Sequence, residues 1–163
     1  MPTVEERLAE HGITLPKPSA PLAAYVPFVQ TGNQLFVSGQ LPLGLDPVPK
    51  GPLTAVDMAE GGTVEPGSTL ALAQMAARQC AINLIAQAKA ATGDLTRVAR
   101  VVKLVGFVSS TSEFTQQPIV VNGASELMAV AFGDAGQHAR SAVGVAALPL
   151  GVVVEVEAIF EVA

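Results

Sequence analysis

The fold of this chain is decided by the stretch His138–Ala158, which reads HARSAVGVAALPLGVVVEVEA. It contains two runs of residues that favour β-strands, separated by Leu148–Gly151, where Pro and Gly interrupt the pattern. In the second run every other residue is apolar, and Glu155 and Glu157 fall on the opposite face. The stretch therefore predicts a β-hairpin whose second strand has one apolar face and one face that carries carboxylates.

Arg140 and Glu155 are the most chemically suggestive groups in this stretch. If the turn lies near Pro149, Glu155 is opposite about Val143–Val145 and Arg140 is opposite about Phe160. At roughly 3.3 Å per residue, more than about 10 Å then separates the two groups along the strands. We expect no ion pair between them within one chain, although a second copy of the chain could complete a cleft that both enter. From spacing alone, a simpler interpretation is favoured over a shared cleft: the carboxylates line a solvated strand face, and Arg140 is a strand-end charge.

Length and composition predict one domain that associates with copies of itself. The chain has 163 residues, half of them apolar, and only 14% are charged, against a usual share of about 25%. Pro, Gly or charged residues interrupt every apolar stretch, so we expect neither a membrane span nor a membrane partner and predict a homo-oligomer that hides apolar surface. A net charge of −5, a single Tyr and no Trp argue against nucleic acid as a partner.

Metal, cofactor and secretion signals are absent from the sequence. Two His and one Cys at scattered positions cannot form a structural zinc site, and no phosphate-binding glycine motif is present. We therefore expect no cofactor. Cys80 is alone, so it forms no internal disulfide and is expected to be a small buried residue. Charged residues at Glu5–Arg7 interrupt the region where a secretory segment would begin, which makes the cytoplasm the expected compartment.

The rest of the chain alternates strands with helices. We predict a single domain, residues 1–163, in which residues 1–22 form a short N-terminal helix and a proline-rich extension. The expected elements after it are a hairpin (Tyr25–Gln30 and Gln34–Ser38), a surface loop (Leu41–Gly62), a long helix (Ser68–Thr92), an apolar strand (Arg97–Ser110), a second long helix (Pro118–Phe132) and the stretch quoted above. This order predicts an α+β sandwich, a mixed β-sheet with two helices on one face. The uncovered face again favours self-association.

Several short motifs resemble the RidA/YjgF family in the same order, over roughly Tyr25 to the C-terminus. They are LFVSGQ (Leu35–Gln40), GDL (Gly93–Leu95), ARSAV (Ala139–Val143), LP (Leu148–Pro149) and VEVEA (Val154–Ala158). The extra N-terminal helix and the long loop resemble the longer subgroup, which is labelled endoribonuclease-like or translation-inhibitor-like. The resemblance implies a chorismate-mutase-like fold and a homotrimer with ligand clefts between subunits. It also implies hydrolysis of reactive enamines and imines to 2-oxo acids and ammonia, without a cofactor.

The resemblance also implies roles for individual residues. Arg140 matches the arginine that grips the substrate carboxylate, for which a guanidinium fork offers two parallel donors. Glu155 matches the acidic residue that orients or activates the attacking water. The other positions that match the cleft of the family are Tyr25, Ser38, Gly39 and Asn122. We expect the loop Leu41–Gly62 to shape the pocket for the substrate side chain.

Two positions depart from the pattern of the deaminating subgroup. Ala142 stands where that subgroup usually has Cys, and Gly144 stands where a Glu is common. Ala142 removes a side chain from the cleft but leaves the carboxylate grip of Arg140 in place, so ligand binding is better supported than turnover. Imine hydrolysis is our first hypothesis. The alternatives are a non-catalytic trimeric module that binds small carboxylates and an endoribonuclease or translation inhibitor, which the acidic charge opposes.

Overall fold

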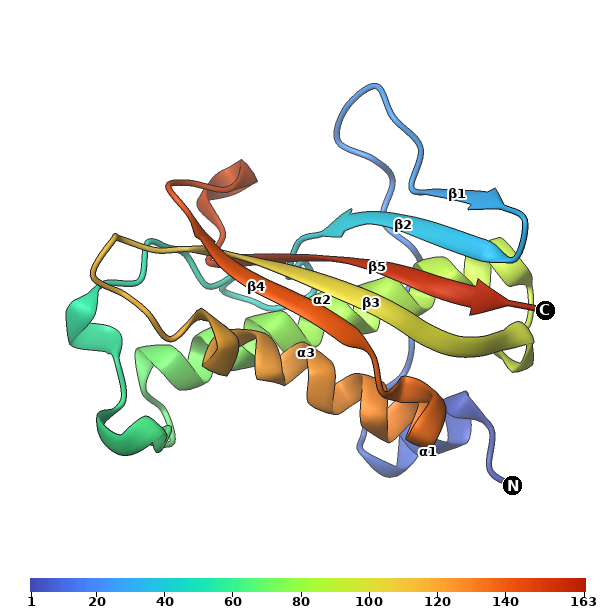
Figure 1. Cartoon of the computed structure of the whole chain (residues 1–163), viewed down its shortest axis with the longest axis horizontal. Helices are drawn as coiled ribbons and strands as arrows, with labels where there is room; N and C mark the ends of the chain where they lie inside the picture. Colours follow the sequence, from blue (N-terminus) through green and yellow to red (C-terminus); the bar gives the residue numbers. More distant parts are fainter.

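The computed structural model describes all residues from Met1 to Ala163 and arranges them in two layers, a five-stranded sheet and helices that cover one of its faces (Figure 1). The helices are α1 (Val4–Glu10), α2 (Thr69–Thr92) and α3 (Gln117–Phe132). The strands are β1 (Phe28–Thr31), β2 (Gln34–Gln40), β3 (Val98–Ser109), β4 (Ala139–Val145) and β5 (Val154–Val162). The predicted α+β class, with a mixed sheet and two long helices on one face, is confirmed.

The long helix α2 begins and ends where capping chemistry predicts. The Ser68 hydroxyl accepts a hydrogen bond from the backbone N–H of Ala71 at 3.1 Å, and Gly93 ends the helix with a left-handed φ of 76°. Small side chains allow close packing: a Cβ on Gly123 of α3 would collide with the backbone carbonyl of Gln74 in α2. The two long helices therefore form one tightly packed layer under the sheet.

The N-terminal helix α1 packs against this layer from outside. Thr3 and Glu6 form the predicted capping box. Leu8 is buried, the Arg7 guanidinium donates to the carbonyl of Ala131 at the end of α3, and Glu5 pairs with Lys89 at 3.1 Å. The helix thus ties the N-terminal extension to both long helices.

The predicted hairpin of β4 and β5 is wrong, because β3 lies between these two strands. The strand order is β1-β2-β5-β3-β4, with β3 parallel to β4 and antiparallel to β5. The connection through Leu148–Gly151 contains a short 3₁₀ turn, but it passes over the end of β3 and closes no hairpin. Val153 anchors it, since its N–H donates to the carbonyl of Pro49 at 3.0 Å and its carbonyl accepts from Ser109 at 2.9 Å. The apolar β3 thereby becomes the central strand.

The loop Leu41–Gly62 is only partly a surface loop. It contains two short 3₁₀ turns, Ala55–Asp57 and Glu60–Gly62. Leu53 is 1% exposed. Its N–H donates to the carbonyl of Ser109, the last residue of β3, at 2.8 Å, and its carbonyl accepts from the N–H of Thr111 at 2.9 Å. The middle of the loop is therefore fixed to the end of the central strand.

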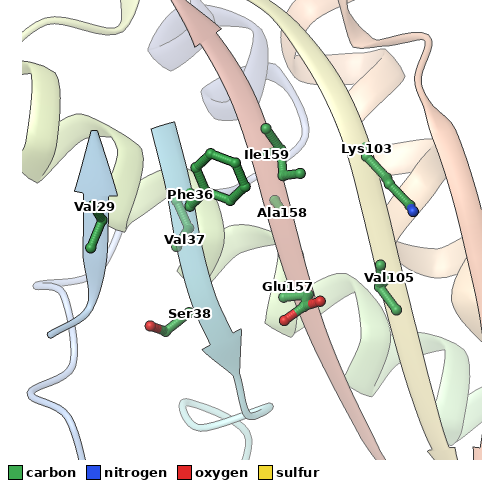
Figure 2. A pocket seen from close by; sticks show the side chains of 9 residues that line it. All are labelled: Val29, Phe36, Val37, Ser38, Lys103, Val105, Glu157, Ala158 and Ile159. Carbon is green, nitrogen blue, oxygen red and sulfur yellow. The ribbon is translucent and has the colours of Figure 1, made fainter. Parts of the chain in front are cut away.

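The two faces of the sheet differ as the alternation in β5 predicts. Val154, Val156 and Phe160 point toward the helices and are fully buried, whereas Glu155 and Glu157 point to the other face. No helix covers that second face (Figure 1). It contains a shallow hollow of about 350 Å³, shown in Figure 2, whose lining includes Phe36 and Lys103. We call this uncovered side the open face.

Candidate functional site

Arg140 projects from edge strand β4 toward α3, on the helix side of the sheet. Its neighbour in the register is Leu104 of β3, a core residue. The guanidinium Nη1 donates to Asn122 Oδ1 at 2.8 Å and to Ser125 Oγ at 3.2 Å, both on α3. Asn122 and Ser125 are three residues apart, so they share one face of the helix. Helix α3 therefore holds the guanidinium by one nitrogen.

The cation of Arg140 has no counter-ion within the chain. Its partners Asn122 and Ser125 are neutral, and the ion pair that the structure contains lies elsewhere, between Lys89 and Glu5. Partial burial lowers the pKa of the Arg140 guanidinium, since desolvation disfavours the charged form. Its Nε and Nη2 make no hydrogen bond to the protein, which leaves a two-donor edge for an anion. The group is thus an uncompensated cation with a free fork.

Glu155 lies on the open face, against a glycine of β2. A Cβ built on Gly39 would come within 2.7 Å of Glu155 Oε1 and 3.0 Å of its Cγ. Burial, and secondly the charge of Glu157, raise the pKa of the Glu155 carboxyl. A carboxylate with a raised pKa is a better proton acceptor at neutral pH than an ordinary one, which suits a general base.

Tyr25 and Ser38 lie near Gly39. Tyr25 is 48% exposed and lines a small hollow that Gly39, Leu41 and the extension residues 19–22 also line. The Ser38 hydroxyl donates to the carbonyl of Val26 at 2.8 Å, and no histidine contacts it. The β-ladder between β2 and β5 is irregular from Val37 to Gln40, which turns Ser38 and Gly39 out of the regular pairing. Four predicted site residues, Tyr25, Ser38, Gly39 and Glu155, therefore gather at this end of β2.

The other predicted residues gather around β4. Ala142 follows Arg140 on the same face of the strand, and its methyl group packs against the core rather than offering a polar group. At Gly144, a Cβ would come within 2.8 Å of Ser110 Oγ and 2.9 Å of Gln117 Nε2. The larger residue that the family resemblance leads one to expect at position 144 would therefore need the side chains of Ser110 and Gln117 to move.

The structure thus divides the predicted site into two halves, and one chain does not bring them together. Arg140 is in register with Leu104 and Glu155 with Phe107, three residues along β3, so their side chains leave opposite faces of the sheet. Strands β3 and β5 lie between β4 and β2. At the usual strand spacing, the axes of β4 and β2 are therefore about 14 Å apart. The expectation that Arg140 and Glu155 form no ion pair within one chain is confirmed.

Two residues of the Arg140 half, Ser125 and His138, were not predicted from the sequence. His138 Nε2 lies 2.9 Å from Ser125 Oγ, and its Nδ1 lies 2.6 Å from the carbonyl oxygen of Gly136. One signal was available: Asn122 and Ser125 are polar residues at a spacing of three in a mostly apolar helix. His138 lies two residues before Arg140, but no spacing rule connects it to Ser125.

Neither a metal centre nor a membrane-spanning helix is present. No three side chains among His, Cys, Asp and Glu lie close enough together to hold a metal ion. Cys80 is buried, and burial raises the pKa of its thiol, so it is not a ready nucleophile. A membrane-crossing segment would need a long apolar helix, and the structure contains none.

Comparison with known proteins matches this geometry to one family. The sequence model of the family described as "YjgF/chorismate_mutase-like, putative endoribonuclease" matches residues 5–162. The chain belongs to this family. The predicted resemblance is therefore confirmed over nearly the whole chain, including the N-terminal helix.

Several known proteins are similar to the chain in sequence or in structure. Protein TCP17 of Trypanosoma cruzi is 46% identical over 161 residues, which is 97% of this chain and 93% of the relative. The crystal structure of Atu1372 from Agrobacterium tumefaciens, a protein of unknown function, is 47% identical with a TM-score of 0.81, and covers 98% of this chain and 92% of that one. The structure of the YjgF gene product from E. coli is 27% identical with a TM-score of 0.57, at 99% and 98% coverage.

Proposed function

We propose that this YjgF family member hydrolyses small 2-imino acids, and the enamines that tautomerise to them, to 2-oxo acids and ammonia. The observation that carries the proposal is the free Nε–Nη2 edge of Arg140, a partly desolvated cation without a counter-ion. Two parallel N–H donors match the two oxygens of a carboxylate. An α-carboxylate on the ligand would supply the missing charge.

Glu155 is the proposed base of the reaction. It accepts a proton from water while the water oxygen attacks the imine carbon and the C=N electron pair moves to nitrogen. Glu155 returns this proton to the nitrogen, which gives a neutral carbinolamine. Glu155 then takes the proton of the carbinolamine hydroxyl and passes it to the nitrogen as the C–N bond breaks, which leaves ammonia and a C=O group. A raised pKa of the Glu155 carboxyl favours these proton transfers near neutral pH.

The proposed site requires two copies of the chain. Arg140 and Glu155 leave opposite faces of one sheet, so a ligand can touch both only if each comes from a different subunit. A homotrimer, as the family resemblance implies, would place the β4 edge of one subunit against the β2 end and open face of the next. The apolar side chains on that face, among them Val29, Phe36 and Val143, are 41–53% exposed in the single chain and support such an interface. The compartment that we propose is the cytoplasm.

A non-catalytic module that captures small carboxylates is the second candidate. Ala142 favours it, because this methyl group packs against the core and offers no polar atom to a reacting ligand. An endoribonuclease, the activity that the family is named after, is the third candidate and has less support, since the net charge of −5 repels a phosphate backbone.

The deciding experiment follows 2-oxo acid release from 2-aminoacrylate generated in situ. We expect wild-type protein to accelerate release over buffer and Arg140→Ala to reduce the rate to that of buffer. Binding of a 2-oxo acid that Arg140→Ala abolishes, without any acceleration, would replace the enzyme by the binding module. If wild-type protein neither binds 2-oxo acids nor hydrolyses the imine, the carboxylate grip itself is refuted.

A further inference from the structure

The hydrogen bonds around Arg140 continue beyond its two direct partners. Ser125 Oγ, which accepts from Arg140 Nη1 at 3.2 Å, lies 2.9 Å from His138 Nε2. On the other side of the imidazole, Nδ1 lies 2.6 Å from the carbonyl oxygen of Gly136. Four groups thus form one line, from the backbone after α3 to the guanidinium.

For a neutral His138, the chemistry of these groups indicates where each proton lies. A carbonyl oxygen can only accept, so His138 Nδ1 carries a hydrogen and donates to Gly136. In the neutral imidazole Nε2 is then an acceptor, and the Ser125 hydroxyl donates to it. The lone pairs of the Ser125 oxygen are left to accept from Arg140 Nη1. Each donor in the line has one acceptor.

We propose that Ser125 and His138 are positioning residues for Arg140. This inference rests on the proposed function, in which Arg140 binds the ligand carboxylate. Together with Asn122, the pair fixes Nη1 and so presents the Nε–Nη2 edge to the ligand. His138 does not touch the guanidinium: it acts through the Ser125 hydroxyl, whose hydrogen it holds.

Neutral partners are well suited to this task. An Asp or Glu at position 125 would also orient the guanidinium, but it would neutralise the cation and compete with the ligand carboxylate. A hydroxyl and an amide hold the group in place and leave its charge uncompensated. Ser125 is a poor nucleophile despite its His partner. It lies within α3, where the backbone N–H groups form helical hydrogen bonds and cannot stabilise an oxyanion.

The first test measures Arg140 directly, without a ligand. In ¹⁵N NMR of the wild type we expect separate, slowly exchanging Nη signals for Arg140 and an Nδ1–H tautomer for His138. Ser125→Ala and His138→Leu should both merge the Nη signals through faster rotation about the Nε–Cζ bond. Unchanged Arg140 signals in both variants, or an Nε2–H tautomer, would overturn the inference whatever the protein binds.

The second test measures the dissociation constant of 2-oxobutyrate by calorimetry. We expect Ser125→Ala and His138→Leu each to weaken binding about two- to tenfold, the effect of freeing one ordered side chain. The double variant should lose no more than either single variant. His138→Gln should restore binding, because its amide oxygen can accept from Ser125. The control is Ser141→Ala, at an exposed position of β4, the strand that carries Arg140.

The outcomes separate this inference from the proposed function. If Arg140→Ala abolishes binding but Ser125→Ala and His138→Leu behave like Ser141→Ala, only the positioning pair is refuted. If Arg140→Ala leaves binding unchanged, the proposed function is refuted, and the NMR signals still decide the role of the pair. Covalent labelling of Ser125 by a fluorophosphonate would overturn the positioning role in favour of a nucleophile.

Discussion

Arg140 and Glu155 leave opposite faces of the five-stranded sheet, and the central strand β3 lies between their own strands. Each is a partly buried charge without an opposite charge beside it in the chain. Burial of an unpaired charge costs free energy, so such groups are more often functional than structural. This arrangement supports the proposal that the two charges are the two ends of a site that a second subunit completes.

Replacing Arg140 by Lys tests the guanidinium fork separately from its charge. Lys keeps the cation but offers no rigid pair of parallel donors, so it cannot bind both oxygens of a carboxylate as the guanidinium fork does. We expect kcat/KM for imine hydrolysis to fall by about 10- to 100-fold, the usual effect of losing a hydrogen bond to a charged group. The matched control is Arg100→Lys, at an exposed position of β3. Equal activity of both variants would show that charge alone suffices.

The acid limb of the pH profile reports Glu155. Because burial and Glu157 raise its pKa, the basic carboxylate is lost at a higher pH than for an ordinary Glu. We expect kcat/KM to fall on the acid side with an apparent pKa above the usual Glu range. Glu157→Gln should shift this limb to lower pH, whereas Glu10→Gln, at the exposed end of α1, should not. An apparent pKa on the acid side at or below the ordinary Glu value would exclude Glu155 as the base.

The same raised pKa predicts a stability effect of Glu155→Gln. Between the ordinary and the raised pKa the folded state keeps a proton that the unfolded state has released, so stability falls as pH rises through this window. Above it the full cost of burying the charge is present, and Gln removes that cost. We expect Glu155→Gln to melt about 1–2 °C higher than wild type at pH 7, a small effect for a partly exposed group. The difference should vanish in acid, and a variant that melts lower at pH 7 would contradict this account.

Replacement by Ala is expected to lower activity at Gly39 and stability at Gly106. Gly39→Ala puts a methyl group within 2.7 Å of Glu155 Oε1, but this flexible carboxylate can turn away. We expect kcat to fall by about 10- to 100-fold with little change in melting temperature, since small misplacements of reacting groups are costly. Gly106→Ala collides with the buried side chain of Val121 and should instead lower the melting temperature. Full activity of Gly39→Ala would mean that the position of Glu155 does not matter.

Local chemistry made the helices and the faces of the strands predictable. Ser68 and Gly93 fix the ends of α2 through a hydroxyl cap and a left-handed φ, and both signals involve only neighbouring residues. The alternation of β5 correctly separated the core side chains from Glu155 and Glu157. Such patterns depend on the backbone geometry of one element and need no knowledge of its neighbours.

Strand order was not predictable in the same way. Two β-rich runs joined by Pro and Gly look the same whether they pair directly or lie on either side of a third strand. The choice depends on β3, whose apolar residues occupy the centre of the sheet, and on Pro49, which holds the connection through Val153. Both are distant in sequence. For the same reason the contacts of Arg140 with α3 could not be read from its own strand.

Subunit complementation tests most directly that Arg140 and Glu155 act on one ligand from different subunits. Arg140→Ala and Glu155→Gln are each expected to be inactive, and they are mixed, dissociated and reassembled into verified hetero-oligomers. In a randomly mixed ring, a site is intact when one subunit supplies Arg140 and the next supplies Glu155, which occurs in about a quarter of sites. We predict recovery of about a quarter of wild-type imine hydrolysis. No recovery in verified hetero-oligomers would contradict a site shared between subunits.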